Sequence, residues 1–427
     1  MDTLWFYAIA FIVIWVLALL FKDKLNISVE GPLLMWRTTR LRDLIDSIAQ
    51  KSPRFWKVYM SIGIPVAVFF AAVMIYFLIL SLKLVLQTPV AAPVLPGVDY
   101  PGNLVYVPLY SGLIGLATVL IVHEFAHGIL ARAEGIKIKS IGLILFAVLP
   151  GAFVEPDEEE VKKASRIAKL RIYAAGSISN LTLAAIALGI YFVLSSFFIP
   201  LAFHSDGILV SSVVPKSPSD GVLKEGMIIN NINGQEIRNF TEYTTFRNNS
   251  KIGDVLTIQT SEGTKIIKLA SNPNNSTAPY AGFRADSHLI VNKNIHDVYG
   301  NLIPWTLYYL SDLFFWMFLL NFLVGTFNVL PIKPLDGGLI FEELLTARMS
   351  EGRVNSITSN FKRNLEQKLK LSEEKAKGIS SGLRKVLSFN ISETKVNKFI
   401  LALSIITWSF LAFNVIYALG RGILLSF

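Results

Sequence analysis

The stretch VYVPLYSGLIGLATVLIVHEFAHGIL, residues 105–130, decides the fold. It belongs to a run of 24 residues without charge between Asp99 and Glu124, which is long enough for a helix to cross a bilayer. In that helix His123 and His127 lie one turn apart on one face and form a zinc-chelating pair, with Glu124 beside them as a candidate general base. Because such groups are costly at bilayer depth, their position indicates a functional site.

The composition is typical of a polytopic membrane protein. Of the 427 residues, 52% are hydrophobic and 17% are charged, whereas about a quarter of a soluble domain is charged. No cysteine is present, so a metal would need His, Asp or Glu ligands, and disulfides and catalytic thiols are excluded. We attribute the net charge of +9 to cytoplasmic loops rather than to nucleic-acid binding, since no aromatic-basic motif accompanies it.

Six windows of the chain are apolar and close to the ~20 residues that a helix needs to span a bilayer. They cover residues 3–21, 58–82, 100–123, 172–205, 313–332 and 399–420. No positive region precedes the first window, so we expect a retained anchor rather than a cleaved signal peptide. Residues 22–57 carry eight Lys and Arg, residues 341–398 carry twelve, and residues 87–103 carry none. Because cytoplasmic loops are rich in Lys and Arg, we expect both termini outside and the two basic segments inside.

Residues 202–300 have the pattern of a small soluble domain, with short β-branched runs separated by Pro, Ser and Gly turns. The stretch ILVSSVVPKSPSDGVLKEGMIINNINGQEI, residues 208–237, resembles a PDZ domain. PDZ domains bind extended peptides at a sheet edge. The alternative is a small β domain that only separates two helices. We expect this domain outside, because long domains are translocated regardless of charge.

Residues 138–154 are apolar but interrupted by Gly142, Pro150 and Gly151. The segment is too short for a further helical crossing. Non-helical backbone is tolerated at membrane depth only where it is buried in protein or lines a cavity. We therefore expect a re-entrant or interfacial strand.

A catalytic zinc site needs a third protein ligand besides two histidines. The best candidate is Asp336 in NVLPIKPLDGG, residues 328–338. The third and fifth windows cross in the same direction, so both motifs arrive at a similar depth near the cytoplasmic side. The prolines of this motif break the helix, and its two glycines permit close approach of the backbone.

Other assignments stay open for these residues. Asp336 could be the N-cap of a helix that begins near Leu339. A third ligand could also come from Glu155 or from residues 158–160, as in soluble zinc proteases. The remaining histidines are expected to be surface residues on the outer side; they are His204, His288 and His296.

The predicted chemistry is peptide hydrolysis. Zinc would polarise the scissile carbonyl, and Glu124 would take the proton from the zinc-bound water and pass it to the leaving amine. Asn180 follows Gly176-Ser-Ile-Ser in the fourth window. It is a candidate for hydrogen bonding to the substrate backbone or the developing oxyanion, and equally a helix-packing amide.

Together these motifs resemble the site-2 protease family of intramembrane zinc metalloproteases. The resemblance rests on HEFAHG, on NVLPIKPLDGG, on the Gly/Ser/Asn helix between them and on the PDZ-like insertion. It implies one Zn²⁺ per chain and the following residues: His123, His127 and Asp336 as ligands, Glu124 as catalytic base, and Asn180 and Asn328 in supporting roles. Two positions depart from the family pattern. Ser177 follows Gly176 where proline is common, and Lys333 stands where an uncharged residue is common; we expect Lys333 to snorkel to the interface.

The resemblance also implies partners. Members cut transmembrane segments of anchored proteins and often release a regulatory factor after another protease has trimmed the ectodomain. We therefore expect single-pass membrane proteins as substrates, an upstream ectodomain protease, contact with the lipid bilayer and no nucleic acid. The expected location is the cell membrane. Two other functions stay open: a catalytically inactive membrane PDZ scaffold, and a divalent-metal transporter.

The expected fold is an α-helical polytopic membrane protein of about six transmembrane helices, with a small extracytoplasmic PDZ-like α+β domain inserted. Its expected organisation is an anchor helix and basic loop (1–57), a membrane core with the zinc motif and the re-entrant segment (58–201), the PDZ-like domain (202–300), a membrane helix with the third-ligand motif (301–341), a cytoplasmic segment (342–397) and a last membrane helix (398–427).

Overall fold

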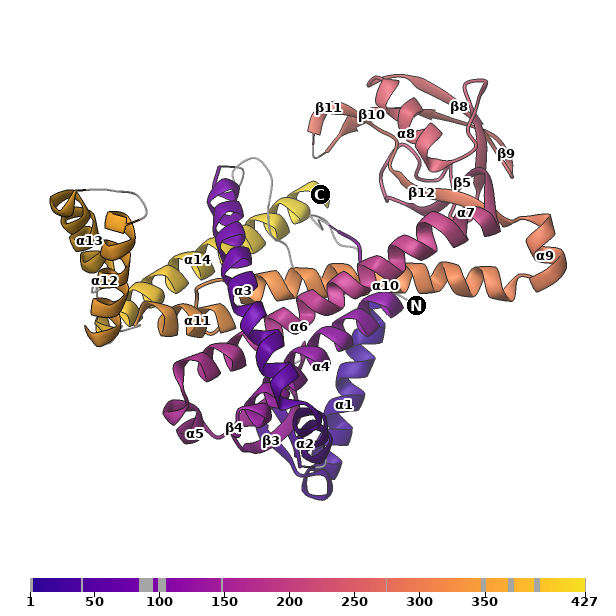
Figure 1. Cartoon of the computed structure of the whole chain (residues 1–427). Coiled ribbons are helices and arrows are strands. Elements are labelled where there is room, and N and C mark those ends of the chain that lie inside the picture. Colours follow the sequence, from indigo (N-terminus) through magenta and orange to yellow (C-terminus); the bar gives the residue numbers. More distant parts are fainter. Residues whose placement is uncertain are drawn as a thin grey trace. The chain divides into compact units, whose positions relative to one another are not determined.

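The computed structural model describes residues 3–39, 41–83, 95–98, 105–146, 149–273, 275–346, 351–367, 372–387 and 392–426 (Figure 1). The chain divides into two compact units. The first unit comprises Met1–Ala187 with Trp316–Phe427, and the second comprises Leu188–Phe315. Most of the loop 87–103 lies outside the described residues, as do the start of the third predicted window and parts of the segment 342–397.

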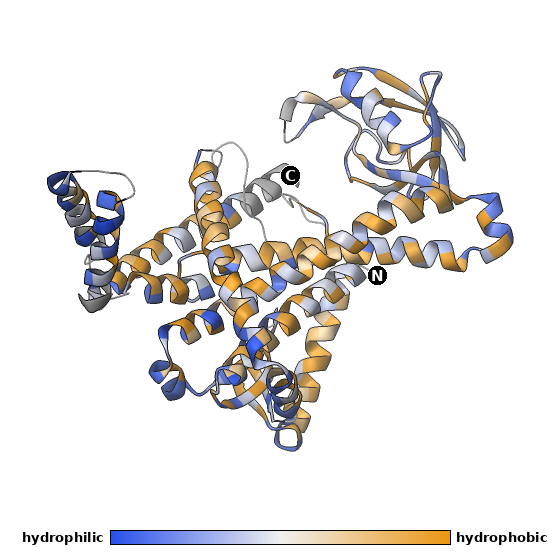
Figure 2. Ribbon diagram, viewed as in Figure 1, coloured by the Kyte–Doolittle hydropathy of each residue, from blue (hydrophilic) through white to orange (hydrophobic). Residues whose placement is uncertain are grey.

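Six helices of the described chain are long and apolar enough to cross a membrane. They are α1 (Thr3–Leu25), α3 (Pro53–Ser81), α4 (Leu109–Ala133), α6 (Arg166–Val193), α10 (Leu302–Asn328) and α14 (Glu393–Ser426). They are predominantly hydrophobic along their length (Figure 2). The prediction of six membrane helices is confirmed, and the protein is an integral membrane protein. Helices suit this environment because they satisfy their own backbone hydrogen bonds.

The HEFAH motif lies within helix α4. This helix begins after Pro108 and continues to Ala133. His123 and His127 are therefore followed by further helical turns.

Four strands form a sheet in the first unit, in the order β1-β2-β3-β4 with antiparallel pairing. Their bounds are β1 (Ile27–Glu30), β2 (Leu33–Thr38), β3 (Ile138–Phe146) and β4 (Leu149–Pro156). The expected strand at 138–154 is confirmed as the pair β3 and β4. Its partners β1 and β2 lie in the basic loop and were not expected. Strand β4 is at the edge of this sheet.

Small residues bring the helices of the first unit close together. A Cβ at Gly63 of α3 would lie 2.9 Å from Ile178 of α6, and one at Gly115 of α4 would lie 2.9 Å from Leu320 of α10. Such close approach is the usual way in which membrane helices gain packing contacts. The buried core joins α3, α4 and α6 to α2 (Arg42–Lys51) and to α11 (Asp336–Leu345).

The polar segment after α11 is helical where it is described, as α12 (Glu351–Gln367) and α13 (Glu373–Leu387). A short helix, α5 (Glu158–Lys163), follows β4. The Asp157 side chain caps it by accepting hydrogen bonds from Glu159 N and Glu160 N.

The second unit contains a β-rich domain. Its main sheet has the order β12-β5-β6-β8-β9, with β7 paired to β6. Bounds are β5 (Phe203–Val213), β6 (Ile228–Ile232), β7 (Gln235–Glu236), β8 (Val255–Thr260), β9 (Gly263–Lys268) and β12 (Phe283–Val291). A hairpin is formed by β10 (Ala270–Asn272) and β11 (Asn275–Tyr280). Further elements are the π-helix η1 (Leu194–Phe198) and the helices α7 (Ile199–Ala202), α8 (Phe240–Asn249) and α9 (Lys293–Tyr299).

Alternation of side chains explains this domain. In β8 buried Leu256 and Ile258 alternate with outward residues, which is the period of a strand with one face on a core. Ile208, Ile229 and Ile267 complete that core from neighbouring strands. The predicted fold class, a helical polytopic membrane protein with a small inserted α+β domain, is confirmed.

Candidate metal centre

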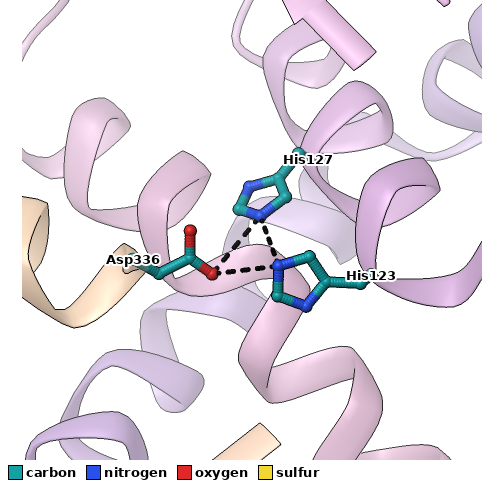
Figure 3. Close-up of side chains that lie close together, drawn as sticks. All are labelled: His123, His127 and Asp336. Carbon is teal, nitrogen blue, oxygen red and sulfur yellow. Dashed lines mark hydrogen bonds and ion pairs between the residues drawn. The ribbon is translucent and has the colours of Figure 1, made fainter. Parts of the chain in front are cut away.

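Three side chains from distant parts of the sequence point toward one another (Figure 3). His123 and His127 come from the middle of α4, and Asp336 comes from the start of α11. The two Nε2 atoms are 3.2 Å apart. Asp336 Oδ2 lies 3.2 Å from His123 Nε2 and 3.4 Å from His127 Nε2. These residues form the one group among the described residues that could hold a metal ion.

The spacing of these atoms fits zinc. Ligand atoms bound to tetrahedral zinc at 2.0–2.2 Å are about 3.3–3.6 Å from one another. The three observed separations of 3.2, 3.2 and 3.4 Å are close to this range. Two imidazoles and a carboxylate also form a usual donor set for catalytic zinc, which keeps a fourth position open for water or substrate.

The tautomer of His127 is fixed by the neighbouring helix. Its Nδ1 lies 2.7 Å from the carbonyl oxygen of Ile172 in α6, and a carbonyl can only accept. The proton therefore resides on Nδ1, and the lone pair of Nε2 faces the centre. Metal-binding histidines are oriented in this way by their outer hydrogen bonds.

Asn180 of α6 orients the other imidazole. Its amide is fully buried, and the distance between Asn180 Nδ2 and His123 Nδ1 is 3.2 Å. Among the described residues, Asn180 Oδ1 has no hydrogen-bond partner. Rotation of the amide by 180° exchanges the positions of Oδ1 and Nδ2. In that orientation Oδ1 accepts a hydrogen bond from the Nδ1–H of His123. That arrangement pairs the buried oxygen and frees Nε2 for a metal.

Gly176 of α6 leaves the space in which the two imidazoles meet. A Cβ at this position would lie 2.5 Å from His123 Nε2 and 2.5 Å from His127 Nε2. No side chain larger than that of glycine is compatible with this histidine arrangement.

Asp336 is the first residue of α11, and the N-cap position is Leu335, which has no side-chain cap. The interpretation of Asp336 as an N-cap is therefore wrong. Its carboxylate instead accepts a hydrogen bond from Ser177 Oγ at 3.2 Å. An ionised carboxylate in this position would be suited to a cationic ligand.

The two glycines after Asp336 permit a tight fold of the preceding loop. A Cβ at Gly337 would overlap the carbonyl oxygens of Val329 and Leu330, and one at Gly338 would lie 2.7 Å from the carbonyl oxygen of Ile332. The loop therefore packs directly on the start of α11.

Glu124 is held beside the three candidate ligands by the edge strand. Its Oε2 accepts a hydrogen bond from the backbone N–H of Val154 in β4 at 3.1 Å. The second carboxylate oxygen is free of this contact. A general base needs this combination of fixed orientation and an available lone pair.

Other predicted residues make no hydrogen bond to the three side chains among the described residues. Asn328 is the last residue of α10, and no hydrogen bond joins it to the three side chains within the described part of the chain. Glu155 accepts from Ser140, and Glu160 accepts from the backbone of Lys137. His204 pairs with Asn292, His288 with Asp206 and His296 with Asp297.

Lys333 forms an ion pair that sequence reasoning did not predict. Its Nζ lies 2.6 Å from Glu342 Oε2 in α11. Sequence reasoning also missed the contacts of Gly176 and Ser177. Their common helix face with Asn180, at spacings of three and four, was the available signal.

The fold and the cluster define the class of this protein: a polytopic membrane protein with a candidate His₂Asp metal centre formed by its membrane helices and the following loop. Residues 111–365 match the model of peptidase family M50. The chain belongs to this family, which confirms the resemblance to site-2 proteases and indicates an enzyme of the metalloprotease kind.

Two relatives support this membership. An uncharacterized protein of Methanocaldococcus jannaschii is 29% identical over 358 residues, covering 82% of this chain and 88% of that protein. A membrane-bound transcription factor site-2 protease homolog of Arabidopsis thaliana is 30% identical over 138 residues, covering 31% of this chain and 27% of that protein.

Solved PDZ domains are similar to a short part of the chain. The PDZ domain of an SdrC-like protein from Listeria innocua is 28% identical and covers 19% of this chain and 97% of that structure, with a TM-score of 0.18. The corresponding domain from Listeria monocytogenes is 25% identical and covers 21% and 93%, with a TM-score of 0.17.

Proposed function

We propose that this protein is an intramembrane zinc endopeptidase that hydrolyses peptide bonds within transmembrane segments of anchored regulatory proteins. The observation that carries the proposal is the approach of His123, His127 and Asp336 to 3.2–3.4 Å. The two histidines and the adjacent Glu124 lie on α4, which is apolar enough to span a membrane. Membership of peptidase family M50 supports the reaction class.

Each residue of the cluster has a distinct role. His123, His127 and Asp336 would hold one Zn²⁺, which when bound would supply Lewis-acid polarisation of the scissile carbonyl. Glu124 accepts the proton of the attacking water and delivers it to the leaving amine. The N–H of Val154 keeps the Glu124 carboxylate facing the reaction. Asn180 supports His123 rather than the substrate, because its amide is fully buried against the imidazole.

The surroundings favour an apolar and extended substrate. An apolar cavity of about 390 Å³ lies between α1, α4 and the four-stranded sheet, with Leu120 and Ala152 in its lining. Leu120 is one helical turn before Glu124, and Ala152 is two residues before Val154 in the edge strand. A peptide bond can be hydrolysed only after it leaves its helix. An unwound apolar segment beside β4 would meet both the cavity and Glu124.

Topology and partners form part of the same proposal. Substrates are single-pass proteins of the cell membrane, and an upstream protease removes their ectodomains first. The inserted domain lies outside and either binds a peptide or excludes untrimmed substrates by size, while the metal centre lies toward the cytoplasmic side. The loop charges support this orientation, with eight Lys and Arg in residues 22–57 and none in residues 87–103.

The test is Glu124→Gln in full-length protein with a membrane-anchored reporter. The Gln carbonyl can still accept the Val154 N–H, so the variant removes proton transfer and little else. We expect zinc content to persist and cleavage to be lost, whereas Asp336→Ala should also weaken zinc binding. The matched control is Glu158→Gln, an exposed carboxylate, which should cleave normally. Undiminished cleavage by Glu124→Gln would overturn the proposed mechanism.

A further inference from the structure

Lys333, three residues before Asp336, is attached to the last membrane helix through both of its backbone groups. Its N–H donates to Ser404 Oγ of α14 at 2.8 Å. Its carbonyl oxygen accepts from Trp408 Nε1, one turn further along α14, at 2.9 Å. A loop residue with both polar backbone groups bound to one neighbouring helix has little freedom to move relative to that helix.

The side chain of Lys333 extends the attachment. Its Nζ lies 2.6 Å from Glu342 Oε2 of α11 and 3.5 Å from Asn397 Oδ1 of α14. The same residue therefore joins the loop, α11 and α14.

The partners in α14 are suited to this role. The Ser404 side chain is buried, and its hydroxyl donates to the Ile400 carbonyl at 2.7 Å, which leaves its oxygen to accept from Lys333. The Trp408 ring lies edge-on to Phe327 of α10, with 6.1 Å between centroids. The Trp408 ring therefore contacts α10 while its N–H is bound to the loop.

A displacement of Lys333 would be transmitted to Asp336 through the backbone hydrogen bonds of this loop. The N–H of Leu335 donates to the Ile332 carbonyl, and the N–H of Gly338 donates to the Leu335 carbonyl, each at 3.0 Å. Because Gly338 also packs against the Ile332 carbonyl, the loop and the start of α11 move as one piece.

We propose that Lys333, Ser404 and Trp408 are positioning residues that hold Asp336 at the metal centre, so that the position of α14 sets metal affinity. The inference rests on the proposed function only in that Asp336 binds the metal. Insertion of another helix beside α14 would displace α14. Such a displacement then weakens the coordination of the metal by Asp336.

The experiment uses full-length protein in lipid nanodiscs and measures affinity for Zn²⁺ and the visible absorption of bound Co²⁺. Trp408→Phe keeps the ring beside Phe327 and removes the N–H. Ser404→Ala removes the hydroxyl, and Ser404→Thr restores it. We expect the Ser404→Ala/Trp408→Phe double variant to bind Zn²⁺ about tenfold more weakly, from the loss of two hydrogen bonds, and its Co²⁺ spectrum should shift. Ser404→Thr, which keeps the hydroxyl and Trp408, should have wild-type affinity and spectrum.

Ser409→Ala, an exposed position of the same helix, is the matched control and should leave affinity and spectrum unchanged. If the double variant fails to fold, Trp408→Phe alone decides through its Co²⁺ spectrum. Wild-type affinity and spectrum in a folded double variant would overturn the inference while leaving the proposed function intact. A wild-type protein that bound no metal through His123, His127 and Asp336 would instead defeat the proposed function itself.

Discussion

Ser177 Oγ donates to Asp336 Oδ2 at 3.2 Å, the same oxygen that faces both imidazoles. Ser177 is completely buried. The Ser177 hydroxyl therefore favours the Asp336 rotamer in which Oδ2 points to the centre of the cluster.

Ser177→Ala should weaken zinc binding. Loss of a hydrogen bond to an anionic ligand oxygen corresponds to roughly 1.5–3 kcal/mol, or about a tenfold or greater fall in affinity. Titration of the purified protein against a zinc-chelating dye measures it. Ser179→Ala, two residues along the same helix, is the control, and equal losses in both variants would contradict a specific role for Ser177.

Gly176→Ala should abolish zinc binding. The added methyl group would lie 2.5 Å from both Nε2 atoms, so the imidazoles cannot keep their positions. Gly189→Ala lies in the same helix with no atom within 4 Å of the new Cβ. It should bind zinc normally. Zinc content measured by atomic absorption distinguishes the two, and a fully loaded Gly176→Ala protein would disprove this packing.

Substitution of Asn180 tests whether its amide supports a metal ligand or only packs between helices. Asn180→Ala removes the partner of His123 Nδ1, and loss of such an outer contact typically costs 10–100-fold in metal affinity. Asn321→Ala removes another fully buried amide, which donates to Thr118 and Met317 in the membrane helices. We expect Asn321→Ala to lower the thermal unfolding midpoint while affinity is retained. Equal zinc affinity in both variants would assign Asn180 to packing.

The membrane architecture was predictable because bilayer thickness sets the length of a spanning helix. Strands β1 and β2 were not expected. ISVE and LLMWRT are short and lie within a basic loop, and only their pairing with β3 stabilises them. A four-residue run cannot be assigned by periodicity alone.

The approach of the three candidate ligands was predictable from the sequence, but the residues that contact them were not. His123 and His127 follow from helical spacing, and Asp336 follows from two helices that run in the same direction. The contacts of Ser177 and Lys333 depend on how helices are rotated about their axes. The periodicity of a single sequence does not determine this rotation. The contacts of Ser177 with Asp336 and of Lys333 with α14 are therefore seen only in the folded chain.

Metal removal should lower stability. Zinc that binds the folded chain alone stabilises it by about 2.7 kcal/mol when its concentration is one hundred times the dissociation constant. The thermal unfolding midpoint should fall with chelator and recover with added zinc. A His123→Ala/His127→Ala double variant should show neither response, and a chelator effect that persisted in it would indicate metal bound elsewhere.

Single cysteines should report the orientation of the chain, because the natural sequence contains none. Glu262 lies in the exposed turn between β8 and β9 of the inserted domain, and Lys51 is exposed at the end of α2. With the basic segments inside, an impermeant thiol reagent added to intact cells should label Glu262→Cys. Lys51→Cys should be labelled only after lysis, because eight Lys and Arg keep its segment in the cytoplasm. The reverse labelling pattern would show that the membrane topology is inverted. The metal centre would then lie toward the outer side, and substrates would have to approach it from outside the cell.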